Sequence, residues 1–319
     1  MKTRVYIDGY NFYYGCLKCT NFKWLDLTFL FENFLLPRSG IPKSVLTKEY
    51  GIKFYTAEIS DKVADDENSV KDQRSYHAGL KNHRQNSVKV QIVKGSYTID
   101  EIDCRLVETD DNGSKKLPRN CEKKAKVWKI EEKQSDVNVA LDAVFDAFID
   151  KDVEQIVFAT NDTDIAPALR KLKELNELKI RSEIKVGLVI PRRDSSDGHR
   201  SGNKSLINLA DWTIHGIKEE ELAKSQLPIL IKGPSTSVYR PVSWFEFSEK
   251  VGEVLEILSS RKVCGSIPKA WRWLHEKKPD VDGLPLLTEN PSEMLFTSDG
   301  VDAVLAHAKA YAEYKLMNA

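Results

Sequence analysis

Short apolar runs alternate along this chain with longer stretches in which apolar residues recur at helical spacing. The runs of strand length are residues 5–7, 51–57, 88–93, 155–160 and 184–190. The stretches of helical spacing are residues 13–36, 70–82, 135–150 and 165–178. Strands that alternate with helices predict an α/β domain with a mostly parallel central sheet that is covered on both faces.

Two parts of the chain depart from this alternation. Residues 100–124 predict an irregular insertion, with Asp110-Asp111-Asn112-Gly113 as its turn signal. Residues 234–241 (PSTSVYRP) predict a linker, and helical stretches follow at residues 245–258, 268–276 and 301–316. We therefore expect an α/β domain over residues 1–220, a linker over 221–241 and a mainly helical C-terminal region, whose role the sequence does not show, over 242–319.

The predicted helix over residues 135–150 combines two features. Ser135 or Asp136 is placed to act as its N-cap. Its apolar residues form one stripe, made of Val137, Ala140, Leu141, Val144, Phe145 and Phe148.

Composition sets the class of protein. The 319 residues carry 48 basic and 48 acidic side chains, so net charge gives no argument for a nucleic-acid partner. Basic residues do gather locally, over residues 71–94, 113–129 and 192–204. No apolar run approaches the roughly 20 residues that span a bilayer. The absence of a signal-like start and an odd count of five cysteines favour a cytoplasmic protein with reduced thiols.

Aspartates stand where a binding site is expected in such a sheet. Asp8 directly follows the first strand, and Asp162 and Asp164 directly follow the strand over residues 155–160. Ligands of parallel sheets bind at the carboxyl ends of the strands. Asp136 opens a helix and faces either that helix's own amides or the strand ends. Ordinary alternatives remain for the others, since Asp8-Gly9 suits a turn and Asp164 suits a helix cap.

Grouped carboxylates repel one another and usually require a cation. Mg²⁺ or Mn²⁺ takes oxygen ligands and keeps several waters, which suits an open site of this kind. Such an ion lowers the pKa of a bound water and stabilises the charge that develops during hydrolysis of a phosphodiester.

Three segments together resemble the signatures of NYN domains, a group of PIN-like nucleases that includes the LabA-like proteins. They are Tyr6-Ile7-Asp8-Gly9-Tyr10-Asn11-Phe12-Tyr13, residues 133–142 (KQSDVNVALD) and Thr160-Asn161-Asp162-Thr163-Asp164. The resemblance implies a PIN-like three-layer sandwich and a metal-dependent endoribonuclease that uses Mg²⁺ or Mn²⁺ and a metal-activated water. It implies Asp8, Asp136, Asp162 and Asp164 as metal-binding and catalytic residues. It also implies Asn11 as a support for Asp8 or for water, and it places Lys133, Arg74 and Asn161 at the substrate.

Several alternatives stay open at this stage. The same domain could serve as the scaffold of a non-catalytic RNA-binding or regulatory protein, and single-stranded DNA could replace RNA as the partner. Oligomerisation is also open. Asp142 matches the NYN pattern, but it lies about 240° around the helix from Asp136, so we interpret it as structural.

The cysteines and tryptophans have alternatives of their own. Four cysteines, Cys16, Cys19, Cys104 and Cys121, could bind zinc, although their spacing favours free thiols. Trp271 and Trp273 stand among Lys269, Arg272, Lys277 and Lys278 and could stack on single-stranded nucleic acid, but tryptophans in a small helical region are more often core.

Overall fold

The computed structural model describes residues 1–62, 64, 66–83, 87–194, 202–276, 278 and 284–317. Its central sheet has the strand order β5-β4-β3-β1-β6-β7-β8, with β2 beside β1. The strands are β1 (Lys2–Asp8), β2 (Val45–Leu46), β3 (Ile52–Ala57), β4 (Val90–Arg105), β5 (Lys124–Lys133), β6 (Gln155–Ala159), β7 (Lys185–Val189) and β8 (Trp212–Ile214). Apart from the antiparallel pair of β4 with β5, the pairings in this sheet are parallel. The predicted α/β class with a mostly parallel sheet is confirmed.

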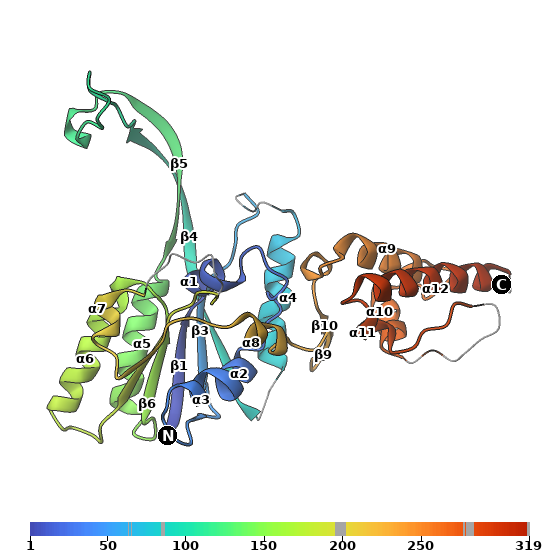
Figure 1. Ribbon diagram of the computed structural model, residues 1–319, viewed down its shortest axis with the longest axis horizontal. Helices are drawn as coiled ribbons and strands as arrows, with labels where there is room; N and C mark the ends of the chain where they lie inside the picture. The colour runs from blue at the N-terminus through green and yellow to red at the C-terminus, as the bar shows by residue number, and fades with distance from the viewer. Residues whose placement is uncertain are drawn as a thin grey trace.

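Helices cover both faces of the sheet (Figure 1). One layer holds α1 (Gly9–Phe12), η1 (Tyr13–Leu17), α2 (Leu27–Leu30), η2 (Phe31–Leu35), α3 (Leu36–Arg38), α4 (Ser69–Asn82) and α8 (Glu219–Lys224). The other holds α5 (Ser135–Ile149), η5 (Thr163–Ile165), α6 (Ala166–Glu177) and α7 (Lys204–Ile207). Successive strand residues point to opposite faces, so Val5 and Ile7 enter one core while Tyr6 enters the other. The domain is therefore a three-layer α/β sandwich.

The strand order creates a switch point beside β1. From β1 the chain proceeds outward through β3 to β4, and it later returns to the other side of β1 and proceeds through β6 and β7 to β8. The crossovers on the two sides of β1 therefore run in opposite directions. Open α/β sheets bind ligands at the carboxyl ends of the strands that flank such a point. Here those strands are β1 and β6.

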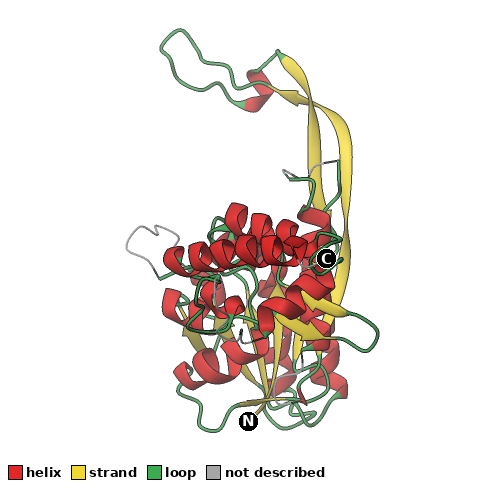
Figure 2. Ribbon diagram, turned by 90° about the vertical axis from the view of Figure 1, so that its right-hand side faces the viewer, coloured by secondary structure: helices red, strands yellow, loops and turns green. Residues whose placement is uncertain are grey.

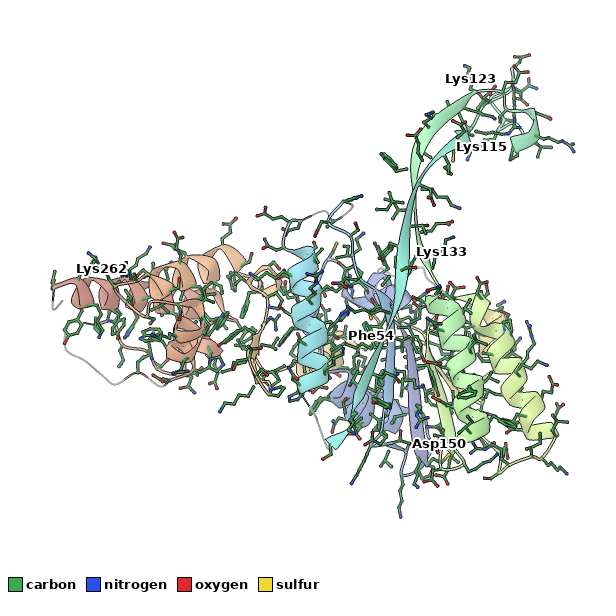
Figure 3. The ribbon with its side chains drawn as sticks, turned by 180° about the vertical axis from the view of Figure 1, so that it is seen from behind. Phe54, Lys115, Lys123, Lys133, Asp150 and Lys262 are labelled. Atoms are coloured by element: carbon green, nitrogen blue, oxygen red, sulfur yellow. The ribbon has the colours of Figure 1, made fainter. Side chains whose placement is uncertain are left out.

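β4 and β5 continue beyond the sheet as a projecting two-stranded arm (Figures 1 and 2). Residues 96–105 pair with residues 124–133 in antiparallel register, so the predicted irregular insertion over residues 100–124 is wrong at both of its ends. Irregular backbone is confined to the tip, which holds η4 (Pro118–Asn120). Lys115 and Lys123 lie at this tip, far from Lys133 at the base (Figure 3). Local pattern could not show this pairing, because the arm's hydrogen bonds join residues up to 37 positions apart.

A second correction concerns residues 13–36, which the apolar spacing predicted as one helix. The chain leaves the helical path after η1 and starts again at α2. Asp26 ends this break, because its carboxylate accepts a hydrogen bond from the Phe29 N–H at 3.0 Å and caps α2.

The C-terminal region has its own core around Trp271. Among the described residues, the helices that build it are α9 (Ser248–Ser259), α10 (Ile267–His275), α11 (Pro291–Met294) and α12 (Ser298–Met317). Trp271 and Trp273 are both buried, so the core interpretation is confirmed for them. Lys277, which the sequence placed beside them, lies outside the described residues.

The segment expected to be a linker carries structure. It contains most of α8, together with β9 (Leu230–Lys232) and β10 (Ser237–Tyr239). The short helix η6 (Val242–Trp244) follows directly after it. Arg240 is buried there and donates hydrogen bonds to the carbonyls of Asn21 and Trp244. The division into three parts stays a prediction. Within the described residues, no helix combines the length and apolar character needed to cross a bilayer.

Candidate active site at the carboxyl edge of the sheet

Asp8 ends the first strand and starts the site. Its buried carboxylate caps α1, with Oδ1 accepting from the Asn11 N–H at 2.9 Å and Oδ2 accepting from the Thr160 hydroxyl at 2.9 Å. Burial raises the pKa of Asp8 in spite of these hydrogen bonds. Gly9 follows because a Cβ at that position would stand 2.4 Å from the Tyr55 carbonyl oxygen. Asp8 is thus held firmly at the switch point.

Thr160 links Asp8 to the end of β6. Its Oγ1 also accepts a hydrogen bond from the Asp162 N–H at 3.1 Å. The Asp162 carboxylate in turn accepts from the Asp164 N–H at 3.0 Å, so Asp162 is the residue that caps η5. Asp164 itself is exposed. Sequence pattern could not single out Thr160, because its role depends on β1 and β6 being neighbours.

Asp136 reaches the site from the first turn of α5. The N-cap of α5 is Gln134, with φ of 77° and no capping hydrogen bond, so the expectation that Ser135 or Asp136 caps this helix is wrong. Burial and the nearby charges of Asp8 and Asp162 together raise the pKa of Asp136 to about 6. These carboxylates are therefore close enough to repel one another.

Three of the four predicted aspartates converge. Asp8, Asp136 and Asp162 each offer one oxygen, and these oxygens lie within 4.8 Å of one another. Such a group could hold a cation. Asp164 does not belong to this group, which is the one such cluster found in the described part of the chain.

The other predicted site residues are placed as follows. Asn11 contacts Asp8. Lys133 pairs with Glu131 at the base of the arm, and Arg74 pairs with Glu58, just after β3. Asn161 accepts a hydrogen bond from the Asn203 N–H at 2.8 Å. Of the four, Asn11 alone makes a hydrogen bond to the converging aspartates in the described structure.

Other sequence interpretations can also be compared with the structure. Asp142 accepts a hydrogen bond from the Tyr55 hydroxyl at 2.8 Å, which agrees with a structural role. The five cysteines are free thiols. Cys16 lies on η1 while Cys104 and Cys121 lie on the arm, so no zinc cluster forms within the described residues. Of the basic residues over 192–204, those from 195 to 201 lie outside the described residues, as does Arg84 of the cluster over residues 71–94.

A group of exposed tyrosines stands beside the aspartates. Phe12 and Cys16 bury one side of α1 and η1, which turns Tyr10, Tyr13 and Tyr14 outward. The ring centroids of Tyr10 and Tyr14 are 4.4 Å apart, and those of Tyr13 and Tyr14 are 5.2 Å apart. We call these three residues the tyrosine platform.

Two charged residues, Lys18 and Glu132, lie within electrostatic reach of the tyrosine platform. The ammonium of Lys18 lies 4.6 Å from the centroid of the Tyr14 ring, a cation–π distance. Glu132 acts electrostatically on both Tyr10 and Asp136, raising the pKa of each, although burial is the larger cause in both cases. Tyr10 of the platform and Asp136 therefore both lie within electrostatic reach of Glu132.

Comparison with known proteins identifies the family. The chain is 36% identical over 318 residues to 6-hydroxy-3-succinoylpyridine 3-monooxygenase HspA of Pseudomonas putida, covering 98% of this chain and 95% of that protein. This chain belongs to the family of that monooxygenase. No protein-family model matches the chain. A crystal structure of a protein of unknown function from Vibrio parahaemolyticus covers 69% of this chain and 94% of its own, at 17% identity and a TM-score of 0.34.

The relationship to a monooxygenase overturns the functional predictions made from the aspartates. An oxygen-inserting relative over nearly the whole chain contradicts a metal-dependent endoribonuclease, and it equally contradicts a non-catalytic RNA-binding scaffold. Mg²⁺ or Mn²⁺ was predicted as the cofactor of phosphodiester hydrolysis and is wrong together with it. The error has a physical reason: strand-end carboxylates indicate a polar site at the switch point, and many reactions can use such a site.

Proposed function

We propose that this protein is a monooxygenase that acts on a hydroxylated pyridine with an acidic side chain. The observation that carries the proposal is the 36% identity over 98% of the chain to the enzyme named for 6-hydroxy-3-succinoylpyridine. That compound combines a flat heteroaromatic ring, a ring hydroxyl and a succinoyl chain that ends in a carboxylate. A site for it needs a surface for the ring, a cation for the carboxylate and a base for the hydroxyl.

The carboxyl edge of the sheet offers all three. The tyrosine platform presents aromatic faces on which a pyridine ring can stack, and ring pairs of this kind prefer centroids 4.5–7 Å apart. Lys18 lies over Tyr14, so it can pair with the carboxylate of a ring stacked beside it. Tyr10, Tyr13 and Tyr14 are all exposed and need no rearrangement of the core to bind a ring.

The aspartates supply the base. A ring hydroxyl that transfers its proton to a carboxylate leaves an electron-rich ring, which favours attack by an oxygen electrophile. Asp136 and Asp162 are partly exposed and can meet substrate, whereas Asp8 is buried and held by Thr160. We assign proton transfer to Asp136 and Asp162, and we assign the positioning of these two residues to Asp8.

A monooxygenase also needs a group that activates O₂, and flavins are one class that does so. In sheets of this strand order the pyrophosphate of a dinucleotide rests on a glycine-rich turn after the first strand. Here that turn reads Asp8-Gly9-Tyr10-Asn11, and the sequence contains no G-x-G. Three carboxylates at this edge would repel a pyrophosphate, so the residues do not fit FAD there.

We further propose that the three-layer sandwich is of the PIN-like NYN type, as a statement about fold alone. The support is that the three signature segments place Asp8, Asp136 and Asp162 within one cluster. A cytoplasmic location is supported by the five free thiols.

Oxygen labelling tests the proposed reaction. The purified protein is mixed with 6-hydroxy-3-succinoylpyridine and NADH under ¹⁸O₂, in parallel reactions with added FAD and with added ferrous iron. We expect substrate-dependent O₂ uptake and one ¹⁸O atom per product molecule by mass spectrometry in one of these reactions. Folded protein that consumes no O₂ in either reaction would refute the proposal.

Matched variants test the assigned residues. Asp136→Asn should lower turnover, whereas Asp152→Asn, at an exposed acid near the opposite edge beside Lys2, should not. Lys18→Met should raise KM by about tenfold for the succinoyl compound, the effect of losing one charge-assisted contact. The same variant should leave KM unchanged for 2-hydroxypyridine, which lacks the carboxylate. Tyr14→Ala should raise KM for both compounds and Tyr14→Phe for neither.

A further inference from the structure

α5 carries its large apolar residues on the outside. The residues that it buries against the sheet include Ala143 and Ala147, whose small side chains let the helix lie close to the strands. Leu141, Phe145 and Phe148 face outward with 63%, 61% and 52% of their surface exposed. An amphipathic helix on a folded domain normally has the reverse arrangement. Four residues of the apolar stripe predicted from the sequence therefore face away from the core, Val137, Leu141, Phe145 and Phe148, whereas Ala140 and Val144 pack against it.

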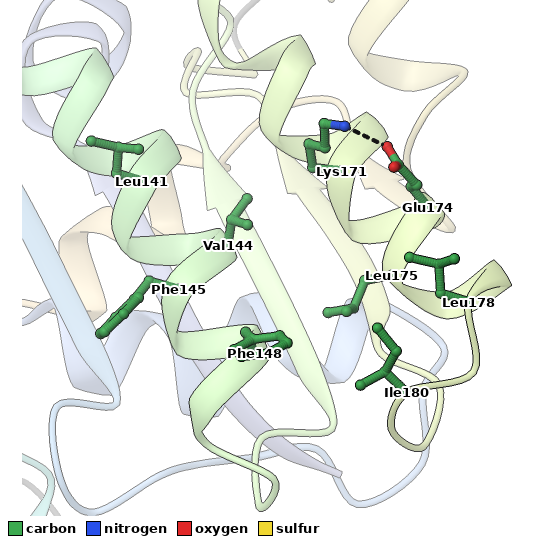
Figure 4. A pocket seen from close by; sticks show the side chains of 9 residues that line it. All are labelled: Leu141, Val144, Phe145, Phe148, Lys171, Glu174, Leu175, Leu178 and Ile180. Carbon is green, nitrogen blue, oxygen red and sulfur yellow. Dashed lines mark hydrogen bonds and ion pairs between the residues drawn. The ribbon is translucent and has the colours of Figure 1, made fainter.

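This stripe borders a groove between α5 and α6. Leu141, Phe145 and Phe148 form one wall, and Leu178 and Ile180 form the other (Figure 4). The groove encloses about 450 Å³. The C-terminal helices α9 to α12 lie on the far side of the sheet from it (Figure 1), so they do not cover it.

The size of this surface matches a protein interface. We call the exposed residues Val137, Leu141, Phe145, Phe148, Leu178 and Ile180 the α5–α6 face; each has more than half of its surface exposed. From these fractions the α5–α6 face exposes roughly 700 Å², above the ~300–600 Å² of the largest patch on a typical monomer. A stable interface of standard size buries about 800 Å² on each partner. The α5–α6 face with its rim provides about that much.

We propose that the α5–α6 face is the interface of a homodimer, in which it packs against the same face of a second copy. A two-fold axis requires a surface that is complementary to itself. The groove meets this condition, because its lining residues include one cation and one anion, Lys171 and Glu174, which pair at 2.6 Å within the chain (Figure 4). In the dimer each can face its counterpart on the other copy, while Phe145 enters the opposite groove. The residues that line the groove have no excess of positive charge to attract nucleic acid or an anionic membrane.

The oligomeric state tests this proposal independently of the reaction. Sedimentation velocity should give a dimer at micromolar concentration. Phe145→Asp should raise the dimer Kd by at least a hundredfold and yield a monomer whose circular dichroism is unchanged, because Phe145 is exposed in the single chain. Glu177→Lys is the matched control, since Glu177 is an exposed residue of α6 outside the groove, and it should leave the dimer intact.

A charge exchange separates contacts between copies from contacts within one chain. A Lys171→Glu chain carries two acids in the groove, and a Glu174→Lys chain carries two bases. Each should dimerise more weakly than the original chain, and a mixture should form mixed dimers in about threefold to tenfold preference, as native mass spectrometry would show. An ion pair confined to one chain gives no such preference.

Three outcomes would overturn the proposal. The first is a protein that stays monomeric at every concentration up to about 50 µM, where an interface of standard size should associate. The second is a dimer that survives Phe145→Asp but dissociates on Trp128→Ser, which would place the interface on the arm, where Trp128 is 67% exposed. The third is sedimentation of the monomer with neutral phosphatidylcholine vesicles through Phe145, which would make the occupant a membrane.

Discussion

Replacing Asp136 by asparagine should stabilise the folded protein at neutral pH. The folded-state pKa of Asp136 is about 6, against 3.8 for an unperturbed aspartate, because burial and neighbouring carboxylates disfavour its charge. A carboxyl group whose pKa is higher in the folded state makes its full contribution to stability at pH values below its unfolded-state pKa. This contribution is lost as the pH rises through the folded-state pKa. Asparagine keeps the shape and never ionises.

The magnitude comes from the shift. Two pKa units correspond to about 3 kcal/mol at full effect, since one unit is worth 1.36 kcal/mol. Asp136 is only partly buried, so solvent screening reduces this to about 1–2 kcal/mol. The gain in the free energy of unfolding on Asp136→Asn should therefore be about 1–2 kcal/mol larger at pH 8 than at pH 4. Most of the change should occur between pH 4 and 6.

Urea unfolding at a series of pH values measures this difference. Chelator is present throughout, because a cation bound by the aspartates would lower their pKa values. The Asp8→Asn background serves as a second test, since losing one neighbouring charge should shrink the pH-dependent gain. A stability difference that stays constant from pH 4 to pH 8, or a variant that is less stable at pH 8, would refute the convergence of these carboxylates.

Three further predictions concern stability. Asp146→Ala should cost about 2–3 kcal/mol in urea unfolding, because its carboxylate pairs with the buried cations Lys53 and Arg4 at 2.6 and 3.2 Å, which would keep only Asp142 and Asp150 as partners; a cost below 1 kcal/mol would contradict this. Gly15→Ala should cost about 3 kcal/mol, since its Cβ would stand 1.7 Å from the Pro191 carbonyl oxygen, whereas Gly252→Ala, with its nearest neighbour at 3.9 Å, should gain up to about 1 kcal/mol. Similar thermal shifts in both glycine variants would be inconsistent with this packing. Arg240→Met should cost about 1–3 kcal/mol by removing the hydrogen bonds from the buried guanidinium to the carbonyls of Asn21 and Trp244, and an unchanged melting temperature would exclude that role.

The reach of sequence reasoning is clearest at the site. Strand ends can be read from apolar runs, because a buried parallel strand is apolar on both faces. Asp8 and Asp162 were therefore placed correctly at one edge of the sheet. Thr160 was missed, since its hydroxyl matters only through a neighbour 152 positions away. The reaction was predicted wrongly, because carboxylates at a switch point are compatible with several chemistries.

The sequence by itself determined the alternation of elements, the α/β class and the edge at which the aspartates lie. Those features depend on short-range periodicity, which each segment carries alone. The tertiary structure decided which aspartates converge, that residues 96–105 and 124–133 pair as an arm, and that the large apolar residues of α5 face outward. Periodicity shows that a helix has an apolar side, but not what lies against it. For α5 the alanines contact the sheet, and its phenylalanines are left for a partner.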